Sequence, residues 1–126
     1  MSTDHHAMRV NYRHLGQYVG KNVRVWGKLL RFEGNDSAIV EASDGGNITV
    51  QWAPGTTIKE LIMPSYQTTT MTDTFVEVIG TVKDHQTIKL MACVNMGSNV
   101  DLKLANDTVE LMHDPRFYQS MFAPLP

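Results

Sequence analysis

The sequence predicts an all-β domain, a small five-stranded barrel, followed by one amphipathic α-helix near the C-terminal end. Three observations support this fold class. Five apolar, β-branched segments are separated by turn-forming residues, without the regular alternation of strands and helices that a parallel α/β sheet requires. The first segment contains an internal glycine, which within a strand usually marks a bend. After residue 100 the strand alternation gives way to a helical period.

The size and charge of the chain limit the possible functions. Its 126 residues are enough for one domain with a single core. No apolar run approaches the roughly 20 residues of a membrane span, and the single cysteine, Cys93, favours an intracellular protein without a disulfide. The formal net charge is −2. Because phosphate neutralisation supplies most of the affinity for nucleic acid, this charge disfavours strong binding by the chain alone.

The first predicted strand, Val23–Phe32, alternates apolar and polar side chains around Gly27. A long strand bent at a glycine can belong to both halves of a small barrel. The turn Asp44-Gly45-Gly46-Asn47 predicts a tight hairpin, because these residues accept a positive φ. The other four predicted strands are Ala38–Ala42, Ile48–Trp52, Phe75–Val82 and Thr87–Val94.

Two further segments complete the barrel. One or two helical turns are expected at His14–Val19. The long connection Ala53–Asp73 contains a possible short helix at Ile58–Met63. A bent first strand, a tight hairpin and a long connection before the fourth strand are typical of an OB-fold. An immunoglobulin-like sandwich would need about seven strands. We therefore expect a mobile N-terminal arm (1–12), an OB-fold (13–100), a C-terminal helix for subunit assembly (101–118) and a tail (119–126).

The predicted helix within Asp101–Tyr118 has an unusually wide apolar side. At about 100° per residue, its apolar side chains cover nearly half the circumference, and its polar side chains gather opposite. A helix that only covers its own domain needs a stripe little wider than about 100°. The surplus predicts two buried faces, one on the domain and one on another molecule. Asp101 is the expected N-cap, and Pro115 is expected to end the helix at Asp114.

Small and large side chains alternate along this apolar arc, as in helix–helix cores. The residues predicted to form the partner interface are Leu104, Ala105, Thr108, Val109, Leu111 and Met112. His113 lies on the polar half, where a solvated or edge-bonded imidazole is expected. The simpler alternative is a terminal helix that covers only its own core.

The ordered set of these segments resembles the small, 14 kDa-class subunit of the eukaryotic replication protein A heterotrimer. The closest likeness is the pattern Leu-x-Leu-x-Asn…Val…His-Asp…Phe-Tyr within Leu102–Tyr118. Weaker likeness lies in the first strand (Val25, Gly27 and Leu29), in Ser43-Asp44-Gly45 and in Glu77–Val82. Together these segments span roughly residues 14 to 118. The connection 53–73 is longer than the family pattern leads us to expect.

The resemblance implies a non-catalytic, chiefly architectural subunit. Its terminal helix would join one helix from each of two larger OB-fold subunits in a three-helix bundle. The complex would coat single-stranded DNA during replication, repair and recombination in the nucleus, and the larger subunits would make most of the DNA contacts.

Single-strand-binding OB-folds combine a basic groove with aromatic side chains on which bases stack. The candidates for DNA binding are Trp26, Lys28, Arg31 and Trp52. Phe32 and Tyr66 are possible additions. The alternative is structural: one tryptophan belongs to the barrel wall and the other closes its end.

The sequence offers little support for catalysis, a metal or a cofactor, and we expect none of them. Cys93 lies within a strand without a nearby histidine, which is typical of a buried, inert thiol. There is no phosphate-binding glycine loop and no Cys-x-x-Cys or spaced histidine pair for zinc. Three alternatives remain: the small OB subunit of a telomere-capping complex, an autonomous single-strand nucleic-acid-binding module, and a homodimer joined through the same helix.

Overall fold

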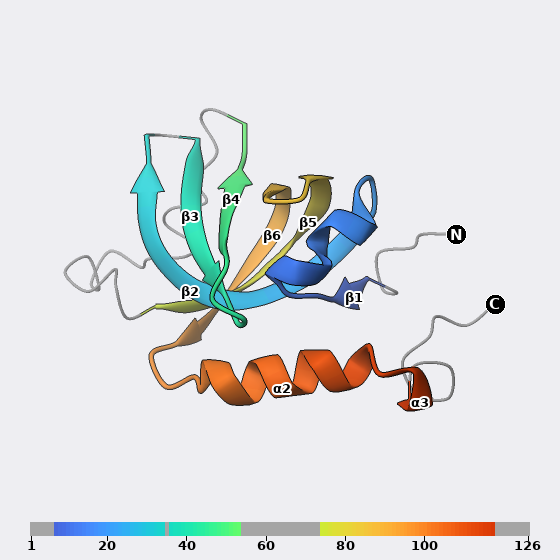
Figure 1. The fold of residues 1–126 in the computed structure, drawn as a ribbon. Helices are drawn as coiled ribbons and strands as arrows, with labels where there is room; N and C mark the ends of the chain where they lie inside the picture. Colours follow the sequence, from blue (N-terminus) through green and yellow to red (C-terminus); the bar gives the residue numbers. More distant parts are fainter. Residues whose placement is uncertain (1–6, 35, 54–73, 118–126) are drawn as a thin grey trace.

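A closed ring of five strands forms the body of the protein (Figure 1). The computed structural model describes residues 7–34, 36–53 and 74–117. The strands of the ring are β2 (Asn22–Glu33), β3 (Ser37–Ala42), β4 (Asn47–Gln51), β5 (Phe75–Asp84) and β6 (Thr87–Gly97). They are hydrogen-bonded in the order β2-β3-β4-β6-β5, and β5 returns to β2. The β4–β6 pairing is parallel and the other pairings in the ring are antiparallel. This arrangement confirms the predicted five-stranded OB-fold.

The ring closes because β2 pairs with two different strands. Its first part pairs with β5 and its second part with β3, and Gly27 takes part in both pairings. A Cβ atom on Gly27 would lie 2.5 Å from the Glu41 carbonyl oxygen and 2.6 Å from a methyl carbon of Val40. A register shift between Leu29 and Arg31 bends the strand further. Only glycine therefore allows β3 to approach this closely at the bend.

The barrel core follows the two-residue period of the strands. Its buried apolar side chains come from every strand of the ring, and most of them are β-branched. The residues that fill the interior include Val23, Val25, Leu29, Val40, Ile48, Val50, Val76, Val78, Val82 and Ile88.

The N-terminal segment differs from the mobile arm expected for residues 1–12. From Met8 onward it belongs to the fold, because β1 (Met8–Arg9) pairs in parallel with β2. The next two residues, Val10 and Asn11, are fully buried, and the Val10 amide donates to the Arg24 carbonyl oxygen over 2.9 Å. Two strand residues are too few to show a period, so this pairing left no pattern in the sequence.

The helical turns predicted near His14 form the 3₁₀ helix η2 (Tyr12–Tyr18). Its start is capped by the tight hairpin turn between β3 and β4. The Asp44 carboxylate accepts hydrogen bonds from the backbone amides of Tyr12 and Arg13, at 3.1 and 3.0 Å. A turn residue some thirty positions away therefore anchors the N-terminal segment to the barrel.

The terminal helix α2 (Leu102–Met112) lies alongside the barrel and is followed by the short α3 (Pro115–Phe117) (Figure 1). The predicted N-cap is confirmed, because the Asp101 carboxylate accepts the Leu104 amide over 3.1 Å. The helix ends two residues earlier than expected, with His113 as its C-cap. Within the described part of the chain, no helix is long and apolar enough to cross a membrane.

All five predicted strands are present, with ends shifted by a few residues. Trp52 lies directly after β4 rather than within it. Several predictions fall outside the described residues: residues 1–6 of the arm, nearly all of the connection 53–73 with its short helix Ile58–Met63, Tyr66 and the tail 119–126.

The close approach at Gly27 can be tested by adding one methyl group. We expect Gly27→Ala to lower the free energy of unfolding in urea by about 1–3 kcal/mol, because the new Cβ overlaps the β3 backbone. Gly16→Ala is the matched control, since its Cβ would lie an ordinary 3.6 Å from the Cβ of His85. Equal effects of the two substitutions would contradict the assigned role of Gly27.

Candidate subunit interface

Helix α2 contacts its own domain through polar side chains as well as through Val109, whereas the sequence analysis placed only part of the apolar arc against the domain. Asn106 and Glu110 point to the N-terminal segment, where the side-chain Nδ2 of Asn11 donates to the side-chain Oδ1 of Asn106 (2.9 Å) and to a Glu110 carboxylate oxygen (2.6 Å). Arg13 Nε donates to the same Glu110 oxygen over 2.8 Å, and its Nη2 binds the other oxygen. One carboxylate thus joins the helix to two residues of the N-terminal segment.

The last turn of α2 adds a second contact of the same kind. His113 Nε2 donates to the Arg9 carbonyl oxygen over 2.9 Å. Its ring stacks on that of His14, with ring centres 4.2 Å apart, and Tyr18 meets it edge-on. We call the side chains that hold α2 to the N-terminal segment the docking cluster: Asn11, Arg13, His14, Asn106, Glu110 and His113.

Glu110 and His14 of the docking cluster have pKa values that differ from their ordinary ones. The hydrogen bond from Arg13 lowers the pKa of Glu110 to about 2, with a further contribution from Asn11, so the carboxylate is ionised at neutral pH. Burial, and then the neighbouring His113, lowers the pKa of His14. His14 is therefore neutral at pH 7, and its 3.3 Å contact with Glu110 is not a full ion pair.

The predicted partner-interface residues divide between the two sides of α2. Val109 is fully buried by its own chain, so the structure corrects its placement on the partner side. Ala105 and Met112 are half-buried at the margins of the same side. Val109 was misplaced because the width of an apolar arc does not show which part of it faces the domain.

Leu104, Thr108 and Leu111 define the outward face of α2. Leu104 is 63% exposed and Leu111 is 46% exposed, which is high for large apolar side chains. The half-buried Thr108 lies between them, and its hydroxyl donates to the Leu104 carbonyl oxygen over 2.9 Å. The one polar group on this face is thus already hydrogen-bonded within the helix. The outward face is apolar in character, and its two leucines are exposed.

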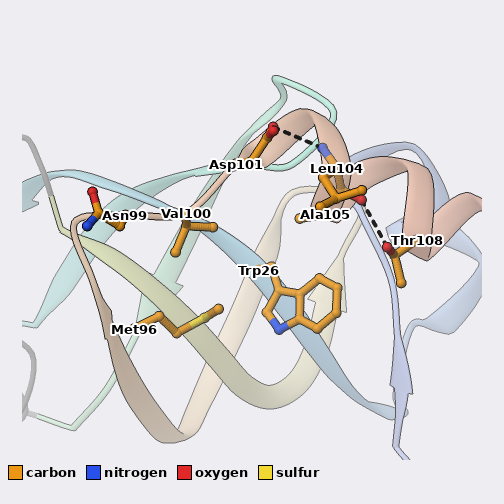
Figure 2. Close-up of a pocket in the computed structure, with 8 residues that line it drawn as sticks. All are labelled: Trp26, Met96, Asn99, Val100, Asp101, Leu104, Ala105 and Thr108. Atoms are coloured by element: carbon orange, nitrogen blue, oxygen red, sulfur yellow. Dashed lines mark hydrogen bonds between the residues drawn. The ribbon is translucent and has the colours of Figure 1, made fainter.

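A groove of about 320 Å³ adjoins the outward face where α2 begins, between the helix and the end of β6. Figure 2 shows the indole of Trp26 beneath the first turns of α2, with Met96 of β6 beside it. Trp26 was predicted to contact DNA. The structure places it in an apolar groove next to the terminal helix, and its contact with DNA stays a prediction.

The other predicted DNA-binding residues lie in different surroundings. Trp52 is only 8% exposed and packs edge-on against Phe32 in the core, so it cannot present a face for stacking; the structure corrects this prediction. Arg31 is exposed and pairs with Glu33 over 2.8 Å. Lys28 is half-buried, with its ammonium 6.0 Å from the centre of the Phe75 ring.

The outer surface of β2, β3 and β4 carries mixed charge. Lys28 is paired with Glu41 across the strands, and Arg31 with Ile39. Of the two aromatic residues within these strands, Phe32 packs against the core and Trp26 lines the groove. Single-strand binding depends on a basic surface with stacking aromatics. The outer surface of β2, β3 and β4 has neither a cluster of basic side chains nor a group of exposed aromatic side chains.

Comparison with known proteins agrees with this arrangement of barrel and helix. The family model for replication factor A protein 3 matches residues 1–118. The chain belongs to the replication factor A protein 3 family. The match covers the barrel, α2 and α3, so the predicted resemblance to the small subunit of replication protein A is confirmed.

Solved structures support the same assignment. A chain in the structure of U. maydis replication protein A bound to single-stranded DNA is 27% identical, with a TM-score of 0.73, over 94% of this chain and 96% of that chain. A chain of the S. pombe Stn1–Ten1 complex (9% identity, TM-score 0.62, 86% and 93% coverage) shares the fold. So does the telomere-capping protein Ten1 of S. pombe (8% identity, TM-score 0.60, 85% and 97% coverage). No curated protein matches the sequence.

The described residues of this family member hold no group of three or more histidine, cysteine or acidic side chains placed to bind a metal. Cys93 packs against the barrel core. Burial, followed by the nearby Glu77, raises the pKa of its thiol to about 12. The thiolate that a nucleophile or metal ligand requires is therefore scarce at neutral pH.

Sequence reasoning missed the docking cluster, although one signal for it is present. Asn106, Glu110 and His113 follow one another at helical spacing, and two of them are uncharged polar residues suited to directed hydrogen bonds. Their partners Asn11 and Arg13 lie about a hundred positions away, in a segment without a period. Only the fold brings the two halves together.

The docking cluster predicts that Glu110 controls how firmly α2 is held. We expect Glu110→Gln to speed hydrogen exchange of the α2 amides, reflecting a loss of about 1–3 kcal/mol, because the charged acceptor shared by Asn11 and Arg13 is removed. Asp107→Asn is the control, since Asp107 is exposed and forms an ion pair with Lys103 of the same helix, one turn away. An equal effect of both substitutions would contradict the role of Glu110.

Lowering the pH tests the contact between Glu110 and Arg13 in a second way. The folded-state pKa of Glu110 (about 2) lies below its ordinary value of 4.5, so its contribution is fully present above pH 4.5. The contribution is lost as the pH falls from 4.5 towards 2. The protection factors of the α2 amides, which compare the intrinsic with the observed exchange rate at each pH, should therefore fall in this window in the wild type, and by a smaller factor in Glu110→Gln.

Proposed function

We propose that this chain is the small, non-catalytic subunit of a replication protein A-type heterotrimer, and that α2 joins it to two larger OB-fold subunits. One observation carries the proposal: α2 is docked through polar side chains, which leaves Leu104 and Leu111 exposed on its outward face. Membership of the replication factor A protein 3 family supports it. The complex would act on single-stranded DNA in replication, repair and recombination, in the nucleus.

The docking cluster suits an assembly helix for a physical reason. Hydrogen bonds to Glu110 and His113 set the orientation of α2 before any partner arrives, and they use none of the apolar side chains of the outward face. A partner helix then meets a surface that is already ordered. Less conformational entropy is lost on binding, which favours affinity.

Single-stranded DNA would be held mainly by the larger subunits. The chain carries a net charge of −2, and phosphate contacts dominate affinity for nucleic acid. With Trp52 in the core and Trp26 beside α2, Lys28 and Arg31 would add at most peripheral phosphate contacts. A replication protein A from U. maydis has been solved on single-stranded DNA, which supports this role for the assembled complex.

A telomere-capping complex is the related alternative. The likeness to Ten1 is one of fold, at 8% identity, whereas the family match covers residues 1–118. We therefore favour the replication complex. An autonomous nucleic-acid-binding module and a homodimer are outcomes that the following experiment distinguishes.

The outward face can be tested by assembly with the two larger subunits in co-expression. We expect Leu104→Asp combined with Leu111→Asp to abolish co-purification, because burying unpaired charge costs several kcal/mol. The control is Lys103→Ala with Asp107→Ala, two exposed positions on the same helix. Val109 is not suitable for this test, because its substitution would disturb the domain itself.

Size-exclusion chromatography of each isolated variant verifies that the barrel stays folded. Assembly of the Leu104/Leu111 variant at wild-type level would overturn the proposal. So would tight, salt-sensitive binding of an oligonucleotide by the isolated wild-type chain, or a stable homodimer that excludes the larger subunits.

A further inference from the structure

The outward face of α2 is too small to form a stable subunit interface alone. The helix has 11 residues and is therefore about 17 Å long. Its outward face consists of Leu104, Thr108 and Leu111. A stable interface usually involves about 20–30 residues on each side. If α2 assembles this chain with larger subunits, the contact must continue beyond the helix.

The exposed apolar side chains show where the contact with the larger subunits continues beyond α2. Six large apolar residues are exposed in the described part of the chain, and all but Val19 lie on α2 or on β6. Met91, Val94 and Met96 of β6 are 52%, 48% and 37% exposed. Met96 also lines the groove beside Leu104. The apolar surface of the helix therefore extends through the groove onto β6.

The floor of this groove is held in place. The Arg9 guanidinium lies 4.8 Å from the centre of the Trp26 ring, and Glu77 binds Arg9 over 3.1 Å and Arg24 over 3.5 Å. Glu77 lies between Trp26 of β2 and Val94 of β6 in the strand register. The indole is therefore fixed on one side by a charged network that is itself paired.

Besides Trp26, three polar residues line the groove: two are hydrogen-bonded within α2, and the third, Asn99, is exposed. The Asp101 carboxylate caps α2 through the Leu104 amide, and the Thr108 hydroxyl binds the helix backbone. The remaining lining comes mainly from Trp26, Met96, Val100, Leu104 and Ala105. Such a groove favours an apolar group over a nucleotide or an ion, because few free polar groups face it.

We propose that a helix of a larger subunit packs on the outward face of α2, inserts one large apolar side chain into the groove above Trp26, and contacts Val94 and Met96 of β6. This inference rests on the proposed function and adds to it the second half of the interface. Trp26, predicted from sequence to bind DNA, thereby becomes the base of a protein-binding pocket.

The test is a competition between each variant and tagged wild-type chain for co-expressed larger subunits. We expect Met96→Asp and Val94→Asp each to be incorporated at least about tenfold less than wild type, as for the loss of an interface hot spot. Val19→Asp is the matched control, since Val19 is 53% exposed but lies at the end of η2 and does not line the groove, and it should be incorporated normally. Thermal unfolding of the isolated variants verifies folding.

Tryptophan fluorescence gives an independent readout. In a Trp52→Phe background only Trp26 emits from this chain, and its emission should shift to shorter wavelength on assembly as the groove is filled. Normal incorporation of Met96→Asp and Val94→Asp, with unchanged Trp26 emission, would overturn this inference. Loss of assembly in the Leu104/Leu111 variant would then still support α2 as the assembly helix. If the Leu104/Leu111 variant also assembles, the proposed function fails with it.

Discussion

The contact of Glu110 with Asn11 and Arg13 determines which side of α2 faces solvent, and the proposed interface depends on it. The helix has more apolar surface than its own domain can cover, so burial alone would leave its rotation about its axis poorly defined. Directed hydrogen bonds resolve this, because they form at one rotation only. Val109 then faces inward, and Leu104 and Leu111 face outward.

Two features of the barrel make that contact possible. Gly27 allows β2 to pair with both β3 and β5. In the closed ring, the first part of β2 also pairs with β1. The Asp44 carboxylate of the hairpin turn fixes the start of η2, from which Arg13 reaches α2. The barrel thus acts as a frame that presents one helix, and its outer surface has little of the basic, aromatic character of a DNA-binding OB-fold.

Much of the fold could be predicted from the sequence because its signals are local. Strand alternation, the bend at Gly27, the hairpin turn at Asp44 and the N-cap Asp101 are each contained in a few consecutive residues. The site was harder to predict because its signals are distant in sequence. The residues around Asn11 and around Glu110 do not indicate that these two side chains form a contact. The residues around Trp52 are equally compatible with a position in the core and with one on the surface. The prediction that a net charge of −2 disfavours DNA binding by the chain alone rests on composition and stays a prediction.

The central claim is that α2 turns its polar docking side chains and Val109 to its own domain and the apolar Leu104 and Leu111 to its partners. Cysteine alkylation at Leu111→Cys and Val109→Cys, in the free chain and in the assembled heterotrimer, tests it directly, since the native Cys93 reacts slowly with its pKa of about 12. We expect position 111 to react rapidly in the free chain and to be protected in the complex, and position 109 to react slowly in both. Rapid reaction at position 109 in the free chain, or equal reaction at position 111 in both states, would contradict the claim.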